Sequence, residues 1–205
     1  MDKRVLVPRP DTETLVAWAL EVLGAASGDV MDLGTASGDV LDLGTGSGAV
    51  ALALKHARPD LTVCATDFSS DALAVARANA ARLNLAVDFS QGSWLGAVTG
   101  RFHAIVANPP YIAALDPHLA RLTHEPLQAL ASGAGGLDDI RQILALAPGH
   151  LHPGGWLLLE HGFDQAAAVR SLLGAAGFAE VQSRRDLSGT ERCSGGKMGV
   201  NSSNL

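Results

Sequence analysis

Short apolar runs alternate along this 205-residue chain with longer segments whose apolar positions recur every three or four residues. The short runs predict strands at residues 40–43, 61–66, 86–90, 102–107, 156–160 and 178–183, and a last, weak strand at 192–198. The longer segments predict helices at residues 12–25, 49–57, 70–83, 137–147 and 165–176. Ser-Ser-Asp at 69–71 is expected to cap the helix at 70–83, and Asn84 to end it. This alternation favours an α/β fold, in which helices cover both faces of a mostly parallel sheet.

The ends of the chain and the connections between its elements indicate one domain. Residues 1–7 have a short strand-like pattern, and residues 199–205 resemble a disordered tail. No linker-like segment divides the rest, so we expect a single domain over residues 1–198. The sequence Pro-Gly-Gly at residues 153–155 predicts a turn that leads into the strand at 156.

Composition narrows the class of protein. The chain is 47% hydrophobic and 18% charged, as globular domains are, and its net charge of −6 disfavours a broad nucleic-acid-binding surface. Its two cysteines provide neither a disulfide framework nor a metal quartet. It shows no signal peptide and no apolar run that could span a bilayer. We therefore expect a cytoplasmic protein with no membrane partner.

A glycine-rich turn follows the predicted strand at residues 40–43. Gly44, Gly46 and Gly48 alternate with Thr45 and Ser47. Glycine allows positive φ and close approach of a ligand, and backbone N–H groups at the start of a helix favour an anion. The spacing matches neither a P-loop, which needs Lys-Ser/Thr, nor the dinucleotide fingerprint G-x-G-x-x-G. The turn suits a phosphate or the carboxylate of an amino-acid-like cofactor.

An acidic residue, Asp67, ends the next predicted strand. An acid at that place can accept hydrogen bonds from both ribose hydroxyls of a nucleoside. Together, the glycine turn and Asp67 favour a binding site for S-adenosylmethionine over an ordinary strand-to-helix turn that binds no ligand. Trp94 lies just past the strand at 86–90, where it would either stack on the purine ring or fill the core.

A rigid polar loop, Asn108-Pro109-Pro110-Tyr111, ends the predicted strand at residues 102–107. The asparagine carbonyl and the proline carbonyls can accept both hydrogens of a planar NH2 group, and the tyrosine offers it a flat face. That arrangement would turn the lone pair of the nitrogen toward a methyl donor. The alternative is a plain proline turn. The long connection that follows is typical of a functional lid.

Several charged or polar residues stay undecided from the pattern alone. Arg9 is either a cation near the cofactor or a surface charge, and Glu125 is either a lid anchor or an exposed charge. His150 and His152 lie two residues apart with no third ligand nearby in sequence, so we expect both to be solvated and predict no metal site. The pair of arginines at 184–185 is expected at the surface, either as plain surface charges or as residues that help to hold a partner.

A ten-residue segment is duplicated in tandem. Residues 27–36 and 37–46 are identical at eight of ten positions, and the second copy has Gly46 where the first has Ala36. Only one copy can be the strand that leads into the helix, and we expect it to be the second. A parallel strand from the first copy is excluded, because the connection is too short for a crossover. We expect this apolar insertion to be destabilising.

These motifs together resemble the HemK/PrmC family, the release factor glutamine methyltransferases. The resemblance runs from Val5 to about Lys197 and rests on five segments of the sequence. They are Pro-Arg-Pro-Asp-Thr-Glu at 8–13, Asp-Leu-Gly-Thr-Gly-Ser-Gly at 42–48, Asn-Pro-Pro-Tyr at 108–111, Glu-Pro-Leu at 125–127 and Leu-Leu-Leu-Glu-His-Gly at 157–162.

The resemblance implies a class I S-adenosylmethionine-dependent methyltransferase, Rossmann-like, with a seven-stranded sheet whose last strand is antiparallel. It implies N5-methylation of the glutamine in the Gly-Gly-Gln motif of peptide chain release factors. By match to the motifs, Gly44, Thr45, Gly46, Ser47 and Gly48 would hold the methionine part of the cofactor. Asp67 would bind its ribose, and Trp94 would lie beside its adenine. Asn108, Pro109, Pro110 and Tyr111 would hold the glutamine amide, with Asn108 next to the cofactor as well.

The sequence departs from the family pattern in three places. The family usually carries a small helical domain ahead of the catalytic one, whereas seven residues precede Pro8 here. The duplication is not part of the pattern, and Ser93 stands where an acidic residue is common. Two other hypotheses therefore stay open, a nucleobase amino-group methyltransferase and an inactive cofactor-binding remnant.

Overall fold

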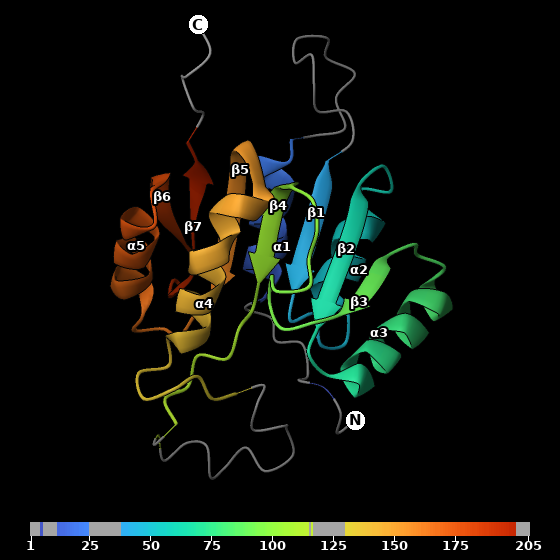
Figure 1. Cartoon of the computed structure of the whole chain (residues 1–205), viewed down its shortest axis with the longest axis horizontal. Helices are drawn as coiled ribbons and strands as arrows, with labels where there is room; N and C mark the ends of the chain where they lie inside the picture. Colours follow the sequence, from blue (N-terminus) through green and yellow to red (C-terminus); the bar gives the residue numbers. More distant parts are fainter. Residues whose placement is uncertain (1–4, 6–11, 25–37, 115, 117–129, 200–205) are drawn as a thin grey trace, which may run out of the picture.

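The protein is a mixed seven-stranded sheet with helices on both faces (Figure 1). This computed structural model describes residues 5, 12–24, 38–114, 116 and 130–199. The strands are β1 Asp39–Leu43, β2 Thr62–Asp67, β3 Asp88–Gln91, β4 Phe102–Ala107, β5 Leu151–Glu160, β6 Phe178–Arg185 and β7 Glu191–Met198. They lie in the order β3-β2-β1-β4-β5-β7-β6, and β7 is antiparallel to both of its neighbours. The predicted α/β class and the antiparallel last strand are confirmed.

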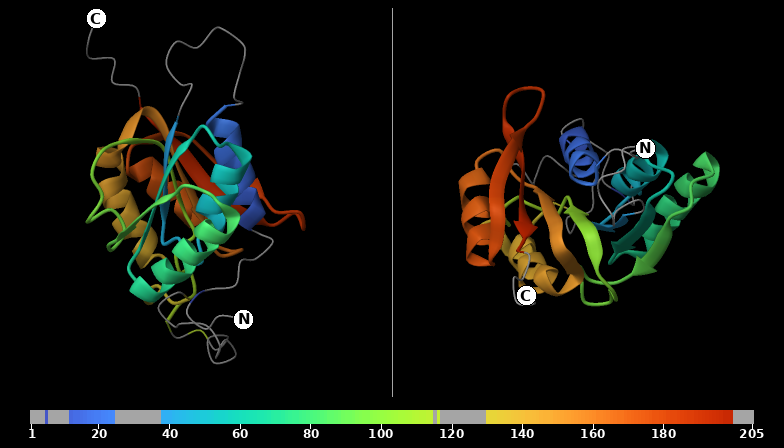
Figure 2. Two further views of the ribbon diagram at one scale, coloured as in Figure 1. Left: turned by 90° about the vertical axis from the view of Figure 1, so that its right-hand side faces the viewer. Right: turned by 90° about the horizontal axis from the view of Figure 1, so that it is seen from above.

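Helices α1 Thr12–Val22, α2 Ala49–Ala57 and α3 Ser70–Leu83 lie on one face of the sheet, and α4 Asp138–Leu146 and α5 Ala166–Ala175 lie on the other (Figure 2). A short 3-10 helix, Ala147–His150, follows α4. One buried cluster joins α1 and α2 to the central strands, and a second joins α4 and α5 to the opposite face. Among the described helices, none combines the length and apolarity that crossing a membrane requires.

The ends of α3 follow the capping chemistry read from the sequence. The side chain of Ser69 accepts a hydrogen bond from the Ala72 N–H at 3.2 Å, and Asn84 ends the helix in the left-handed conformation with φ 54°. Helix α1 is shorter than predicted, ending at Val22 rather than at residue 25. The strand-like pattern at residues 1–7 lies outside the described residues except for Val5, which is in a bend.

The prediction of a turn at residues 153–155 is wrong. Strand β5 already begins at Leu151, which pairs with Phe102, and pairing resumes between Ala104 and Trp156. The Pro-Gly-Gly sequence is therefore a bulge inside a longer strand, because β4 offers partners on both sides of it. At Gly155 an added Cβ would lie 3.0 Å from two carbonyl oxygens, so a side chain there would be tightly packed.

The second copy of the duplicated segment forms β1, as predicted. Val40 pairs with Val63 of β2 on one side and with Ala104 of β4 on the other, so this copy occupies the centre of the sheet. The first copy lies outside the described residues. The tail expected at 199–205 also lies outside them, apart from Gly199.

Candidate active site

Three sequence motifs meet at the carboxyl edge of the central strands. Leu43, the last residue of β1, pairs with Thr66 of β2 and with Ala107 of β4. The next residue on each strand is Gly44 on β1, Asp67 on β2 and Asn108 on β4, so these three residues emerge side by side. Strand order reverses between β1 and β4. Such a switch point is where open α/β sheets bind their ligands.

The glycine turn is held in an unusual backbone path. Gly44, Gly46 and Gly48 all have positive φ, at 67°, 56° and 83°. The N–H of Thr45 donates to the carbonyl of Thr66 at 2.9 Å, which ties the turn to β2. A Cβ added at Gly46 would meet nothing within 4 Å, so the turn is open to a ligand on that side.

The carboxylate of Asp67 lies across the turn. Its Oδ2 accepts a hydrogen bond from the Gly46 N–H at 2.8 Å, and its Oδ1 accepts one from the Ser69 N–H at 2.8 Å. The side chain is half-buried and oriented by both bonds. An anionic oxygen pair is thereby fixed beside the place where the turn is open.

Asp42 is a buried acidic residue next to the glycine turn, and no role for it was predicted. Its Oδ2 accepts hydrogen bonds from the Thr45 hydroxyl at 2.6 Å and the Ala51 N–H at 3.2 Å. Burial raises the pKa of Asp42 to about 7, against the lowering effect of these two bonds, and the charge of Asp67 raises it further. The one sequence signal that pointed to Asp42 was its position as the first residue of the motif at 42–48.

Trp94 takes the core-filling role that the sequence left open, and its stacking on a purine ring stays a prediction. Its ring packs against the core on the α4 side and also lies against Gly44, where an added Cβ would meet it at 3.1 Å. The indole N–H donates to Oδ1 of Asp139 at 3.0 Å, and the Asp139 N–H donates to the Ser132 hydroxyl at 2.8 Å. The ring is therefore held at the border of the glycine turn by a residue 45 positions away.

The Asn-Pro-Pro-Tyr loop is anchored at both ends by residues that sequence reasoning missed. The Asn108 amide donates to the hydroxyl of Thr12, the buried first residue of α1, at 3.4 Å. At the other end, Nε2 of Gln165 donates to the carbonyl of Tyr111 at 3.0 Å, while its Oε1 accepts from the Gly162 N–H at 2.9 Å. These anchors fix the loop between α1 and α5.

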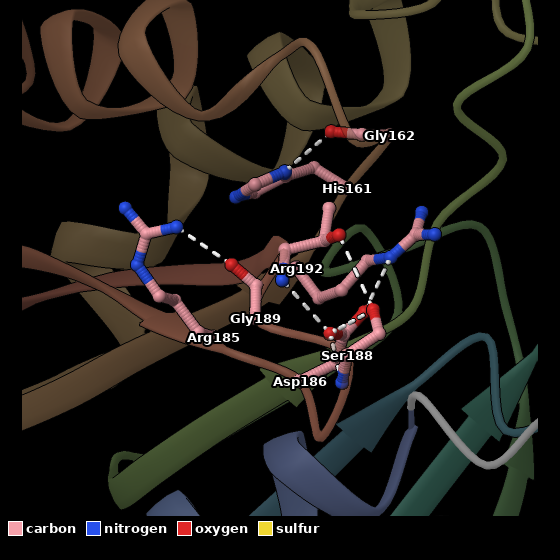
Figure 3. Close-up of polar contacts among 8 residues, drawn as sticks. His161, Gly162, Arg185, Asp186, Ser188, Gly189 and Arg192 are labelled. Atoms are coloured by element: carbon pink, nitrogen blue, oxygen red, sulfur yellow. Dashed lines mark hydrogen bonds and ion pairs between the residues drawn. The ribbon is translucent and has the colours of Figure 1, made fainter.

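A buried histidine supports the second anchor. Nδ1 of His161 is 2.9 Å from the carbonyl of Gly162, which Figure 3 shows, and its Nε2 is 2.7 Å from the Ser194 hydroxyl. Burial lowers the pKa of His161, so the ring is neutral, with the Nδ1 proton donated to Gly162 and Nε2 accepting from the serine. The bonds made by His161 and Gly162 thus position Gln165 and, through it, Tyr111.

The two ends of the long connection after Tyr111 pair with each other. Ile112 and Ala131 form a parallel bridge, with the Ile112 N–H donating to Leu130 at 3.0 Å and the Ser132 N–H donating to Ile112 at 2.9 Å. Residues 117–129, which include Glu125, lie outside the described residues, and so does Arg9. Their predicted roles stay predictions.

Both arginines of the predicted surface pair reach the surface. Arg185 is exposed, and the Arg184 side chain is 38% exposed, lies 5.3 Å over the ring of Trp18 and donates to Glu21 at 2.7 Å. The expectation that both histidines are solvated is corrected for His152, which is half-buried with its ring beside that of His103. His150 lies 3.2 Å from the Gly100 carbonyl.

Comparison with known proteins agrees with this geometry. Residues 20–137 match the family model described as methyltransferase small domain. The chain is 54% identical over 191 residues to the release factor glutamine methyltransferase of Pseudomonas aeruginosa, covering 91% of this chain and 66% of that protein. It is 50% identical over 205 residues to the protein of the same name from Burkholderia pseudomallei, covering 95% and 68%. The chain thus spans about two thirds of the length of these curated relatives.

Solved structures give the same result. A release-factor-specific protein-(glutamine-N5) methyltransferase from Alicyclobacillus acidocaldarius is 31% identical, with a TM-score of 0.55 and coverage of 94% of each chain. A methyltransferase from Pyrococcus furiosus has a TM-score of 0.71 over 98% of this chain and 88% of that one, at 20% identity, which supports the fold alone. The fold is that of class I S-adenosylmethionine-dependent methyltransferases, and the chain belongs to the release factor glutamine methyltransferase family.

Proposed function

We propose that this chain transfers a methyl group from S-adenosylmethionine to the side-chain N5 of the glutamine in the Gly-Gly-Gln motif of peptide chain release factors. The observation that carries the proposal is the placement of Asn108 beside Gly44 at the switch point of the sheet. The names of the relatives supply the substrate class, and the site supplies a way to hold it.

The residues of the turn fit the cofactor. Gly46 leaves open space where a Cβ would be, and the half-buried Asp67 carboxylate stands beside it. We assign the methionine part to the turn from Gly44 through Thr45, Gly46 and Ser47 to Gly48, the ribose hydroxyls to Asp67 and the adenine to the side of Trp94. When bound, S-adenosylmethionine supplies a methyl group on a positively charged sulfur, which makes the methyl carbon an electrophile.

The Asn-Pro-Pro-Tyr loop fits a primary amide. Because Asn108 directs its NH2 group to Thr12, its carbonyl oxygen is the end that can accept a hydrogen from the substrate NH2. A carbonyl of Pro109 or Pro110 would accept the second hydrogen, and Tyr111 would lie against the amide plane. Asn108 would also border the cofactor, since it emerges beside Gly44.

Alignment is the main contribution of these groups. An amide nitrogen is a weak nucleophile, so the chain must hold it in one orientation with its lone pair toward the methyl carbon. Well-aligned groups lower a barrier by roughly 7–11 kcal/mol. Neutral acceptors suit the task, because the positive charge of the donor disperses as the methyl group moves.

The proposal extends to the setting of the reaction. Residues 1–198 would act as one methyltransferase catalytic domain, in the cytoplasm, where release factors are found. The partner would be the release factor itself, with no direct contact to nucleic acid or membrane. The net charge of −6 supports a protein substrate over a nucleobase in DNA or RNA.

The test is a transfer assay with radiolabelled S-adenosylmethionine. The full chain is incubated with a release factor, with the same factor carrying glutamine-to-alanine in its Gly-Gly-Gln motif, and with DNA and RNA. Label on the first protein alone supports the proposal. Label on nucleic acid alone supports a nucleobase methyltransferase, and cofactor binding without transfer to any substrate supports an inactive remnant; either result contradicts the proposal.

A further inference from the structure

Three side chains with metal-binding groups meet at the amino edge of the sheet, opposite the glycine turn. Asp39 is the first residue of β1, and His103 and His152 are the second residues of β4 and β5. Each offers a ligand atom, and these atoms all lie within 4.8 Å of one another. All three residues are half-buried, and the two imidazole rings are 4.5 Å apart between centroids.

The strand register explains why these side chains meet. Val40 pairs with Ala104, so the preceding residues, Asp39 and His103, are neighbours across β1 and β4. Phe102 pairs with Leu151 just before the register shifts, and the residues that follow them, His103 and His152, have their rings side by side there. Neighbours in register point to the same face of a sheet.

The backbone next to the cluster is irregular. Directly after His152, the strand bulges over residues 153–155, where pairing between β4 and β5 is interrupted. Gly155 is packed against the carbonyls of His152, Phe102 and His103, so this bulge has a defined shape. Bulges occur often where a strand must direct a side chain to a site.

The cluster contains one hydrogen bond between its own members. Nδ1 of His103 accepts the N–H of Asp39 at 3.1 Å, so a metal at Nδ1 would replace one backbone hydrogen bond.

We propose that Asp39, His103 and His152 bind a divalent transition metal ion of the zinc, nickel or copper class. Two imidazole nitrogens and one carboxylate oxygen form a donor set that these ions prefer, whereas magnesium and calcium prefer oxygen ligands alone. Water completes the coordination. The ion joins the starts of three adjacent central strands, at the edge away from the proposed transfer site, so its role is structural.

The test uses the full chain, prepared without a polyhistidine tag and stripped with a chelator. Calorimetric titration with zinc and with nickel chloride is expected to give one site per chain, and magnesium none. The bound ion should raise the melting temperature in proportion to the logarithm of its free concentration. His103→Ala and His152→Gln should each weaken binding on the order of tenfold or more, and Asp39→Asn should weaken it too.

His150→Ala is the matched control, because His150 lies near the same edge but outside the cluster. Equal affinity in the wild type and the His103 and His152 variants overturns the proposal, as does loss of binding in the His150 variant or no saturable binding at all. Since a variant can also fail to fold, ring 15N spectra of the wild type provide a second readout. Zinc should shift the His103 and His152 signals and leave that of His150 in place; the reverse pattern contradicts the assignment.

Discussion

The hydroxyl of Thr12 accepts a hydrogen bond from the side-chain amide of Asn108 at 3.4 Å, although the two residues are 96 positions apart. The bond joins the start of α1 to the loop after β4. It links two motifs that the sequence presents separately, Pro-Arg-Pro-Asp-Thr-Glu at 8–13 and Asn-Pro-Pro-Tyr at 108–111. Through Thr12, the first motif therefore orients the side-chain amide of Asn108.

Thr12→Val removes this acceptor while keeping the shape of the side chain. A neutral hydrogen bond contributes roughly 0.5–1.5 kcal/mol, so single-turnover methyl transfer should slow about 2- to 12-fold. Thr12→Ser keeps the hydroxyl and should retain near wild-type rates. Equal rates in the valine and wild-type proteins would show that Thr12 does not position Asn108.

Asn108→Ala removes the proposed acceptor of the substrate amide. We expect transfer to fall on the order of 10²–10³-fold, as for loss of one oriented polar group in other active sites, while cofactor binding measured by calorimetry survives. Loss of binding with unchanged chemistry in the bound fraction would contradict the assigned role.

Asp42 should make cofactor affinity depend on pH. Its pKa is raised to about 7 in the free protein, so the carboxyl is largely protonated below that pH. A cationic ligand nearby favours the ionised form, so binding releases a proton below pH 7. Affinity should therefore increase as the pH rises toward 7 and level off above it, and Asp42→Asn should flatten the profile.

Calorimetry in buffers of different ionisation enthalpy measures the proton release directly. The wild type should release a proton on binding below pH 7, and the Asp42→Asn variant should not. A pH profile that is the same in both proteins would remove Asp42 from the linkage.

The glycines of the turn differ in how much space surrounds them. Alanine at either Gly44 or Gly46 would adopt positive φ, which costs roughly 1–2 kcal/mol for an L-residue. Only at Gly44 would the methyl group also meet the Trp94 ring, at 3.1 Å. Gly44→Ala should therefore lower the free energy of unfolding more than Gly46→Ala does, as measured by denaturant titration. The opposite order would mean that the ring moves aside without cost.

The hairpin between β6 and β7 should contribute to the free energy of unfolding in a way that is lost at low pH. The Ser188 hydroxyl, the Thr190 N–H and Arg192 lower the pKa of Asp186 to about 2 from its ordinary 3.8 (Figure 3). A lowered folded pKa means that this stabilisation is complete above pH 3.8 and is lost as the pH falls through about 2. Between pH 3.8 and about 2, the free energy of unfolding of the Asp186→Asn variant should therefore fall less than that of the wild type. Parallel acid-unfolding curves for the two proteins would contradict this.

The sequence was sufficient for the features that depend on local patterns. The apolar runs located the strands, Ser69 and Asn84 located the ends of α3, and Gly46 identified the copy that becomes β1. The side-by-side placement of Gly44 and Asn108 followed because both end parallel strands. These features need only neighbouring residues or the general topology of parallel sheets.

The anchors of the site could not be read in the same way. Asp139 holds Trp94 across 45 positions, and Gln165 holds Tyr111 across 54. Nothing in the residues around each partner signals such a contact, because tertiary packing alone brings them together. The bulge at 153–155 was mistaken for a turn for a related reason. Its composition is that of a turn, and only the pairing of β4 on both sides keeps it in the sheet.

The duplication enters the chain between two fixed points. Arg58 donates a hydrogen bond to the Gly24 carbonyl on one side of residues 25–37, and the Thr62 N–H donates to the Gly38 carbonyl at 3.2 Å on the other. Both points lie near the start of β2, at the far edge from Asn108. We therefore expect changes in the length of this connection to leave the pairing of β1 with β4 next to Asn108 in place. For the same reason, we expect a reporter peptide inserted there to lie far from the glycine turn.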